Sequence, residues 1–492
     1  MFLGVDLGTS GIKLVLTNSS GEIVDSATSA FEVSRPQPLW SEQNPQDWWD
    51  GFCSAMDQLN IQHDLSAIKA IGFAGQMHGA TLLDKQQQVL RPAILWNDGR
   101  CEAQCAEIEK QVPNAREITG NIIMPGFTAP KLLWVKQHEP EVFAKIDKVL
   151  LPKDYLRLLL SGEFASDMSD AAGTMWLDVD KRCWHQDMLH ACGLNESHMP
   201  ALFEGNEITG TLADAVAKRW NMNPVPLVAG AGDNAAGAIG VGIVKPGQAM
   251  LSLGTSGVYF AVSEGFRSNP ESAVHSFCHA LPGTWHLMSV MLSAASCLQW
   301  YAEQVAKKEV SVLLTELEQT TKNETTDTQD SIQNAPLFLP YLSGERTPHN
   351  NPNATGAFFG LTHSSLQVAL THSVLEGVTF GLADGVDALH ASGVQVDEIT
   401  LIGGGAKSAY WRQLIADVLQ RPVTYRQGGD VGPGLGAARL AQLAMQPEKP
   451  IEQICPQPTL DSVYQPNPEK AQSYAQRRAK FSALYQATQE FF

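Results

Sequence analysis

The chain has 492 residues, which is more than one hydrophobic core usually supports, so two large domains are expected. Its 34 basic and 52 acidic residues give a net charge of -18, which argues against binding to a nucleic-acid backbone or an anionic membrane surface. No apolar run of about 18 residues could cross a bilayer, and the first residues lack the charge pattern of a signal peptide. We therefore expect a cytoplasmic protein with neither nucleic acid nor membrane as a partner.

Apolar runs separated by turn residues predict that the first half begins with a meander of short strands. Strands are expected over 2–5, 12–16, 22–24, 67–74, 89–96, 148–151 and 226–229. The helical spacing of apolar residues predicts helices over 44–59 and 153–160, one after residue 100 and one after residue 134. Residues 166–174 are expected to form a polar loop.

The second half of the chain repeats this kind of order. Strands are expected over 248–252, 398–402 and 423–425, and helices over 292–301, 366–392, 408–418, from residue 432 and at the C-terminus. The polar stretch 311–334 is expected to be a helix that ends in an exposed loop. Because both halves combine meanders with strand–helix units, we predict two α/β domains, residues 1–244 and 245–492, related by duplication.

A five-residue repeat, Leu-Gly-Thr-Ser-Gly, occurs at residues 7–11 and again at 253–257, each time between strand-like runs. Glycine allows a backbone to approach phosphate oxygens closely, and convergent amides and hydroxyls bind anions. Asp6 precedes the first copy and could hold Mg²⁺ directly or through water, whereas Ser252 precedes the second. The candidate phosphate-binding residues are Thr9, Ser10, Lys13, Gly254 and Thr255. The alternative is a pair of hairpin turns selected for shape alone.

Three further sites follow predicted strands. Asp233, in a run of glycine and alanine, suits a general base that reaches a substrate hydroxyl, but an aspartate that caps a helix is equally compatible. Met77 and His78 are either ligand contacts or structural residues. The run 403–405 of three glycines offers a flat surface for a planar base at Gly404 and Gly405, or else permits close packing of a helix on a strand. It lacks the glycine spacing of a Walker A loop.

In these residues the chain resembles the FGGY carbohydrate kinases, a family of actin-like, ribonuclease-H-like ATPases. Residues 126–134 (Gly-Phe-Thr-Ala-Pro-Lys-Leu-Leu-Trp) are similar to the first signature of the family. Residues 356–361, followed by Leu-Glu-Gly at 375–377, are similar to the second. Residues 40–45 match a pentulose-kinase motif except for Leu39, where glycine is usual. The resemblance implies two ribonuclease-H-like domains with an interdomain cleft.

Within the family, residues 75–79, 96–100 and 232–237 are most similar to those of members that phosphorylate xylulose. This similarity implies that ATP and Mg²⁺ are used to convert D-xylulose into D-xylulose 5-phosphate. The implied roles are a base for Asp233, a metal contact for Asp6, sugar contacts for Met77, His78, Asp233 and Asn234, phosphate contacts for Ser10 and Thr255, and adenosine contacts for Gly404 and Gly405.

Other functions stay open at this point. The chain could phosphorylate ribulose, gluconate or glycerol, although the Arg-Glu pair of glycerol kinases is replaced here by Met77-His78. It could also be an actin-like ATPase without kinase activity. The sequence is compatible with a homodimer but does not determine the oligomeric state.

Overall fold

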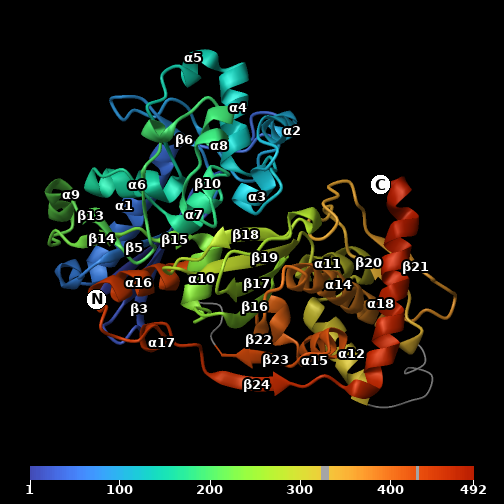
Figure 1. The fold of residues 1–492 in the computed structure, drawn as a ribbon. Helices are drawn as coiled ribbons and strands as arrows, with labels where there is room; N and C mark the ends of the chain where they lie inside the picture. The colour runs from blue at the N-terminus through green and yellow to red at the C-terminus, as the bar shows by residue number, and fades with distance from the viewer. Residues whose placement is uncertain (323–331, 428–431) are drawn as a thin grey trace.

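The computed structural model of the chain describes residues 1–322, 332–427 and 432–492. Two seven-stranded sheets dominate it, one from each half of the sequence (Figure 1). The first has the strand order β13-β14-β5-β1-β2-β3, with β15 paired to β5. Its strands are β1 (Phe2–Leu7), β2 (Gly11–Thr17), β3 (Ile23–Ala30), β5 (Ile71–Gly75), β13 (Ile208–Thr211), β14 (Pro226–Val228) and β15 (Ala231–Gly232).

The second sheet has the order β18-β19-β17-β16-β22-β23-β24. Its strands are β16 (Gly247–Leu253), β17 (Gly257–Ser263), β18 (His275–Cys278), β19 (Trp285–Met291), β22 (Val396–Ile402), β23 (Val423–Arg426) and β24 (Leu460–Tyr464). In both sheets an antiparallel hairpin carries the repeated sequence, and its first strand pairs in parallel with a strand from later in the chain. The two halves thus share one local topology around the repeat.

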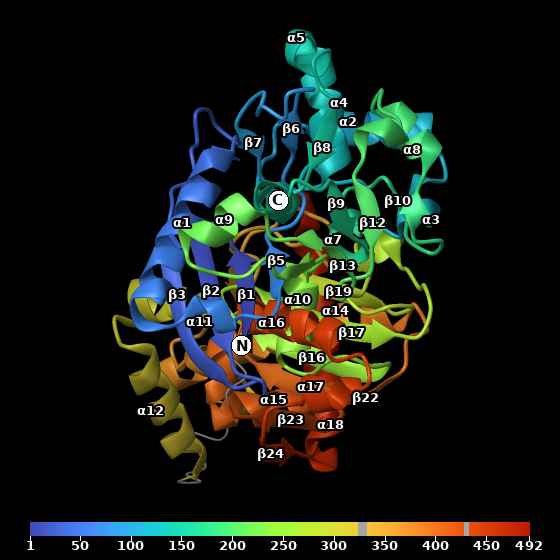
Figure 2. The same ribbon diagram turned by 90° about the vertical axis from the view of Figure 1, so that its left-hand side faces the viewer.

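Helices flank the two sheets (Figures 1 and 2). Those of the first half are α1 (Pro45–Gln62), α2 (Glu102–Gln111), α3 (Ala115–Thr119), α4 (Thr128–His138), α5 (Pro140–Phe143), α6 (Pro152–Ser161), α7 (Met168–Ala172), α8 (Gln186–Ala191), α9 (Asp214–Arg219) and α10 (Asp233–Gly240). Those of the second half are α11 (Ala295–Trp300), α12 (Val310–Lys322), α14 (Gln367–His390), α15 (Ala409–Leu419), α16 (Gly432–Met445), α17 (Ile451–Ile454) and α18 (Pro468–Thr488). No helix in the described part of the chain is long and apolar enough to cross a membrane.

Helix α16 comes from the second half of the sequence but packs on the first sheet, against β1 and β5 (Figure 2). A Cβ atom on Gly4 would lie 1.9 Å from the carbonyl oxygen of Gly434. A Cβ atom on Gly72 would likewise lie 1.9 Å from the oxygen of Ala437. Backbones can approach this closely only at glycine. Because α16 comes from the second half of the sequence but packs on the first sheet, the structure does not establish residue 244 as the domain boundary. That boundary stays a prediction.

Three predicted elements differ from those observed. The strand expected over 89–96 is reduced to β7 (Ala93–Ile94), because Pro92 has no N–H to donate to a ladder. Residues 126–134 do not precede a helix but largely form one, α4, which accommodates Pro130 in its first turn, where N–H groups have no helical partner. The expected polar loop 166–174 contains α7, whose Ser169 and Asp170 amides donate to the Asp167 side chain.

The helix predicted at the start of the polar stretch 311–334 is confirmed as α12. The exposed loop predicted after it falls mainly on residues 323–331, which lie outside the described part of the chain.

Candidate active site

Two aspartates lie near each other where neighbouring strands of the first sheet end. Strands β1 and β15 both pair in parallel with β5, so Asp6 and Ala231 lie on either side of Ala74. Asp233 follows β15 directly, as the first residue of α10. Because the carboxyl ends of parallel strands meet at one edge of a sheet, the fold brings together the predicted metal ligand and the predicted base.

The electrostatics of this pair are unusual for aspartates. Burial, and after it the Asp233 carboxylate, raise the pKa of Asp6 to about 7 against the opposing charge of Lys13, its antiparallel neighbour on β2. Burial raises the pKa of Asp233 to about 6, although Asn234 opposes this rise by donating N–H groups to Asp233 Oδ1 at 2.7 and 2.9 Å. The helix-capping alternative for Asp233 is wrong, because Gly232 occupies the N-cap position of α10.

Both copies of the repeat form the tips of hairpins, as predicted. Gly8 N donates to Gly11 O at 3.0 Å, and Gly254 N donates to Ser256 O at 3.1 Å. Ser10 and Thr255 are exposed at the two tips. Their hydroxyls are therefore free to meet a ligand in both loops.

The first loop is held by hydrogen bonds from side chains that were not among the predicted site residues. Gln43 Nε2 donates to Thr9 O at 2.6 Å, and Gln76 Nε2 donates to Gln43 Oε1 at 2.9 Å. Trp96 Nε1 donates to Thr9 Oγ1 at 2.9 Å. Gln43, Gln76 and Trp96 each belong to one of the motifs quoted above, and that membership was the only signal of their role. They hold Thr9 from both its carbonyl and its hydroxyl.

The predicted sugar contacts Met77 and His78 lie beside the candidate base. Met77 Sδ lies 2.8 Å from the point where a Cβ atom on Gly232 would stand, so it packs directly against the residue before Asp233. His78 Nδ1 lies 2.8 Å from Gly173 O, which assigns the ring proton to Nδ1 and leaves Nε2 as an acceptor. Burial lowers the pKa of His78 to about 3, so the imidazole is neutral at physiological pH.

The backbone of His78 is held in a left-handed conformation, with φ of 68°. Its carbonyl oxygen accepts hydrogen bonds from Lys131 Nζ at 2.9 Å and from Thr128 Oγ1 at 3.1 Å. Both donors lie on α4, in the segment that resembles the first family signature. A backbone conformation that is costly for histidine is thus stabilised by hydrogen bonds from the neighbouring helix.

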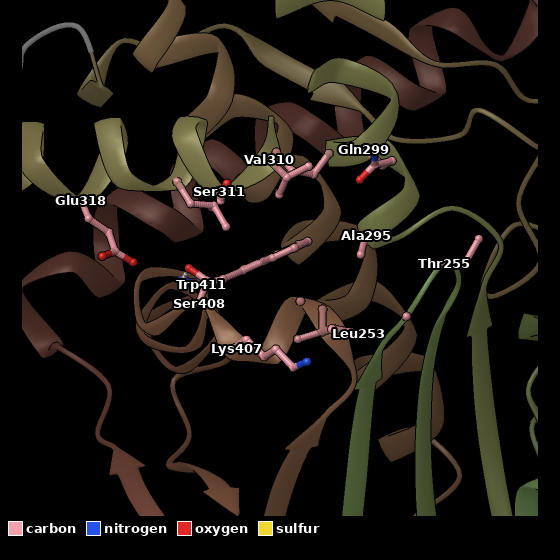
Figure 3. Close-up of a pocket in the computed structure, with 15 residues that line it drawn as sticks. Leu253, Thr255, Ala295, Gln299, Val310, Ser311, Glu318, Lys407, Ser408 and Trp411 are labelled. Atoms are coloured by element: carbon pink, nitrogen blue, oxygen red, sulfur yellow. Dashed lines mark hydrogen bonds between the residues drawn. The ribbon is translucent and has the colours of Figure 1, made fainter. Parts of the chain in front are cut away.

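Beside the second loop lies a cavity of about 470 Å³. Its lining includes Gly254, Thr255, Gly404, Gly405, Val310 and Trp411. Figure 3 shows the Trp411 side chain between Val310 and Ser311 on one side and Leu253 on the other. This cavity has the apolar walls and the size that suit a nucleoside base. The structure therefore joins the predicted adenosine residues to the second predicted phosphate loop.

The glycine run 403–405 is compatible with both roles left open by the sequence. A Cβ atom on Gly405 would lie 3.0 Å from both Leu253 and Trp411, so this glycine permits close packing. Gly404 is exposed, and a Cβ atom there would meet nothing within 4 Å. Because Gly404 lines the cavity and has no side chain, a planar ring could lie over it.

We expect Gly404→Leu to raise KM for ATP by about tenfold or more, because the new side chain would occupy space in the cavity without disturbing its walls. The matched control is Gly265→Leu, at another glycine with nothing within 4 Å, which lies outside the cavity lining. Initial rates with varied ATP measure the effect. Equal KM values for ATP in the two variants would remove Gly404 from the nucleotide site.

A buried ionic cluster supports the strand end that carries Asp233. Lys153 Nζ lies 2.7 Å from Asp154, 2.6 Å from Asp167 and 3.0 Å from Asp170, and all four side chains are fully buried. Ser169 Oγ donates to Asp167 and accepts the Gly232 amide at 3.1 Å. The cluster is therefore connected through one hydroxyl to the residue before Asp233.

The residues around Asp6 fit Mg²⁺, which usually takes one or two carboxylates and completes its shell with water and phosphate. Burial and, after it, repulsion from the Asp233 carboxylate raise the pKa of Asp6, and a divalent cation would offset that repulsion. No group of three or more His, Cys, Asp or Glu side chains that could hold a metal occurs in the described ranges. The site thus suits a metal that arrives with phosphate.

Comparison with known proteins establishes the class. Residues 1–240 match the N-terminal domain and residues 249–445 the C-terminal domain of the FGGY family of carbohydrate kinases. The chain therefore belongs to this family of kinases, and the expected family and two-domain actin-like fold are confirmed. Xylulose kinase of Escherichia coli (strain K12) is 61% identical over 99% of both chains, and that of Klebsiella pneumoniae is 56% identical over 99% of this chain and 98% of its own. The crystal structure described as a xyloylose kinase from Brucella ovis, 46% identical, covers 100% of both chains with a TM-score of 0.93.

Proposed function

We propose that this kinase transfers the γ-phosphoryl group of ATP to the 5-hydroxyl of D-xylulose and releases D-xylulose 5-phosphate and ADP. The proposal is supported by full-length similarity to xylulose kinases. The observation that carries it is the packing of Met77 against Gly232, which joins the candidate sugar contacts to the candidate base. A family that phosphorylates sugars needs both in one site.

Asp233 is the proposed general base. Its carboxylate accepts the proton of the 5-hydroxyl as that oxygen bonds to the γ-phosphorus, while the bond from phosphorus to the bridging oxygen of ADP breaks. With a pKa near 6, the carboxylate is ionised at neutral pH yet more basic than an ordinary aspartate. Asn234 orients it by donating two hydrogen bonds to Oδ1, which leaves Oδ2 for the substrate.

The other candidate residues bind and orient the nucleotide. The amides and hydroxyls of the two repeated loops, together with Lys13, would hold the phosphates, and the cavity over Gly404 would hold the adenine. Asp6 would hold Mg²⁺, which neutralises charge on the phosphates when bound. Since phosphoryl transfer depends mainly on positioning and charge stabilisation, these groups suffice for the reaction.

The function is tested by measuring ADP release with D-xylulose, D-ribulose, other pentuloses, hexuloses, gluconate and glycerol as separate substrates. We expect kcat/KM to be highest for D-xylulose. A higher value for another compound would assign a different kinase specificity. ADP release that is indifferent to every sugar would instead favour an actin-like ATPase without kinase activity.

We expect Asp6→Asn to lower kcat by about 10²-fold and to raise the Mg²⁺ concentration that gives half-maximal rate, because one anionic oxygen near the metal is lost. The measurement is a Mg²⁺ titration at saturating ATP and D-xylulose. The control is Asp180→Asn, at an exposed aspartate. An unchanged Mg²⁺ dependence in Asp6→Asn would reject the metal role.

A further inference from the structure

Arg346 lies in the segment between β20 (Leu337–Leu339) and β21 (Ala357–Phe359), and its neighbours attach it to the second sheet. Thr347 N donates to Val290 O at 3.1 Å, and Thr347 Oγ1 accepts from Val290 N at 3.1 Å. On the sheet, Val290 is paired with Val258. Because β17 begins directly after the second glycine loop, Arg346 lies at the same end of the sheet as that loop.

The guanidinium is linked to His78, a candidate sugar contact, through His275 and Phe127. Arg346 Nη1 lies 3.3 Å from His275 Nε2, and His275 Nδ1 lies 3.0 Å from Asn121 Oδ1. The Asn121 oxygen can only accept, so the ring proton is on Nδ1 and Nε2 accepts from Arg346. The His275 ring packs edge-to-face on Phe127 at 5.6 Å, and Phe127 packs the same way on His78 at 4.9 Å. Two aromatic contacts thus link Arg346 to His78.

Most of the donor capacity of Arg346 is unused. In the described part of the chain its side chain makes this one hydrogen bond and no ion pair with a carboxylate. By contrast, Arg100 and Arg157 are paired with Asp98 and Asp154. A guanidinium has five N–H donors, and leaving donors without acceptors in a half-buried position is costly. The remaining donors of Arg346 are therefore available to a ligand.

The contacts order the site from one end to the other. Asp233 lies beside Asp6 at the phosphate end, Met77 packs against Gly232, and His78 lies beyond Met77 toward Phe127. Arg346 follows in the same series of contacts, through His275 and Phe127. In this series of contacts Arg346 is separated from Asp233 by Met77 and His78, the candidate sugar contacts.

We propose that Arg346 binds the hydroxyketone end of the pentulose, donating one hydrogen bond to the O2 carbonyl oxygen and one to the O1 hydroxyl. Two neighbouring oxygens match the forked donors of a guanidinium, and both can accept. The 5-hydroxyl, at the other end of the five-carbon chain, then faces Asp233. Arg346 is thus a specificity-determining residue contributed by the half of the chain that also carries the second phosphate loop. This assignment rests on the proposed xylulose kinase function.

The test compares D-xylulose with 1-deoxy-D-xylulose, which lacks the O1 hydroxyl, in the wild type and in Arg346→Gln. We expect the wild type to lose about 10- to 100-fold in kcat/KM on the deoxy sugar, because a donor built for that oxygen is left unpaired. In Arg346→Gln we expect a similar loss on D-xylulose but a difference between the two sugars of less than about threefold. KM for ATP should be unchanged.

Arg267→Gln is the matched control, because Arg267 is an exposed arginine in the same half of the chain. Arg346→Lys is the second variant, which keeps the charge but not the fork and should retain part of the discrimination. Thermal unfolding of each variant checks folding. The proposal would be overturned if Arg346→Gln and Arg346→Lys showed the same ratio of kcat/KM between the two sugars as the wild type. A wild type that does not phosphorylate D-xylulose would instead overturn the proposed function.

Discussion

Asp233→Asn is expected to lower kcat for D-xylulose phosphorylation by about 10³-fold, because an amide cannot accept the proton of the 5-hydroxyl. KM for ATP should change little, since Asp233 lies beside the sugar contacts and not in the cavity over Gly404. Initial rates with each substrate varied separately measure both constants. In the wild type, kcat/KM for the sugar should fall as pH decreases through about 6, where the carboxylate becomes protonated.

The same substitution is expected to stabilise the protein at neutral pH. Burial raises the pKa of Asp233 from 3.8 to about 6, so between these values the folded protein holds a proton that the unfolded chain has lost. Stability is therefore lost as pH rises through this window, and the cost is complete above pH 6. Removing the charge should recover on the order of 1–2 kcal/mol at pH 8, allowing for water at the half-buried carboxylate.

Thermal unfolding at pH 8 and pH 5 tests this gain, which should shrink at the lower pH because Asp233 of the wild type is then largely protonated. Asp180→Asn, at an exposed aspartate, is the control for the loss of one negative charge. Turnover within a few-fold of the wild type in Asp233→Asn would exclude Asp233 as the base. Reduced stability at pH 8 would contradict the proposed burial cost.

Lys153→Met is expected to destabilise the folded protein by about 3–5 kcal/mol, the cost typical of removing one partner from a buried ionic cluster. Burial opposes the charge of Lys153, but three aspartates raise its pKa overall, so it is the cation that neutralises them. Without it, burial and the remaining carboxylates would raise the pKa of Asp170 still further. The Gly232 amide would also lose a well-ordered acceptor, because Ser169 is positioned by Asp167.

Chemical denaturation with far-UV circular dichroism measures this effect. Lys181→Met removes a lysine whose side chain is 71% exposed in its pair with Asp178, and it should cost less than about 1 kcal/mol. If Lys153→Met were as stable as this control, the cluster would not be a main support of the strand end before Asp233.

Much of the fold could be predicted because its signals are local. Alternating apolar residues and turn residues predicted the hairpins around both copies of the repeat, and the helix predicted over 408–418 is confirmed as α15, with Ser408 at its N-cap. The predictions were wrong where one side chain altered the backbone structure that its neighbours favour. Asp167 caps α7 where a loop was expected, and Pro92 limits a predicted strand to two residues.

The sequence by itself determined the class of protein, because the repeat, the glycine run and the signature segments each need particular residues at consecutive positions. It also identified Asp6, Met77, His78 and Asp233 as candidates, since each follows a strand. Only the tertiary structure decided which of these lie together: parallel pairing with β5 brings Asp6 to Asp233 across more than two hundred residues of sequence. It also revealed the Lys153 cluster and the unused donors of Arg346. The burial of a side chain and its interaction partners depend on residues that are distant in the chain, so a local sequence pattern cannot predict them.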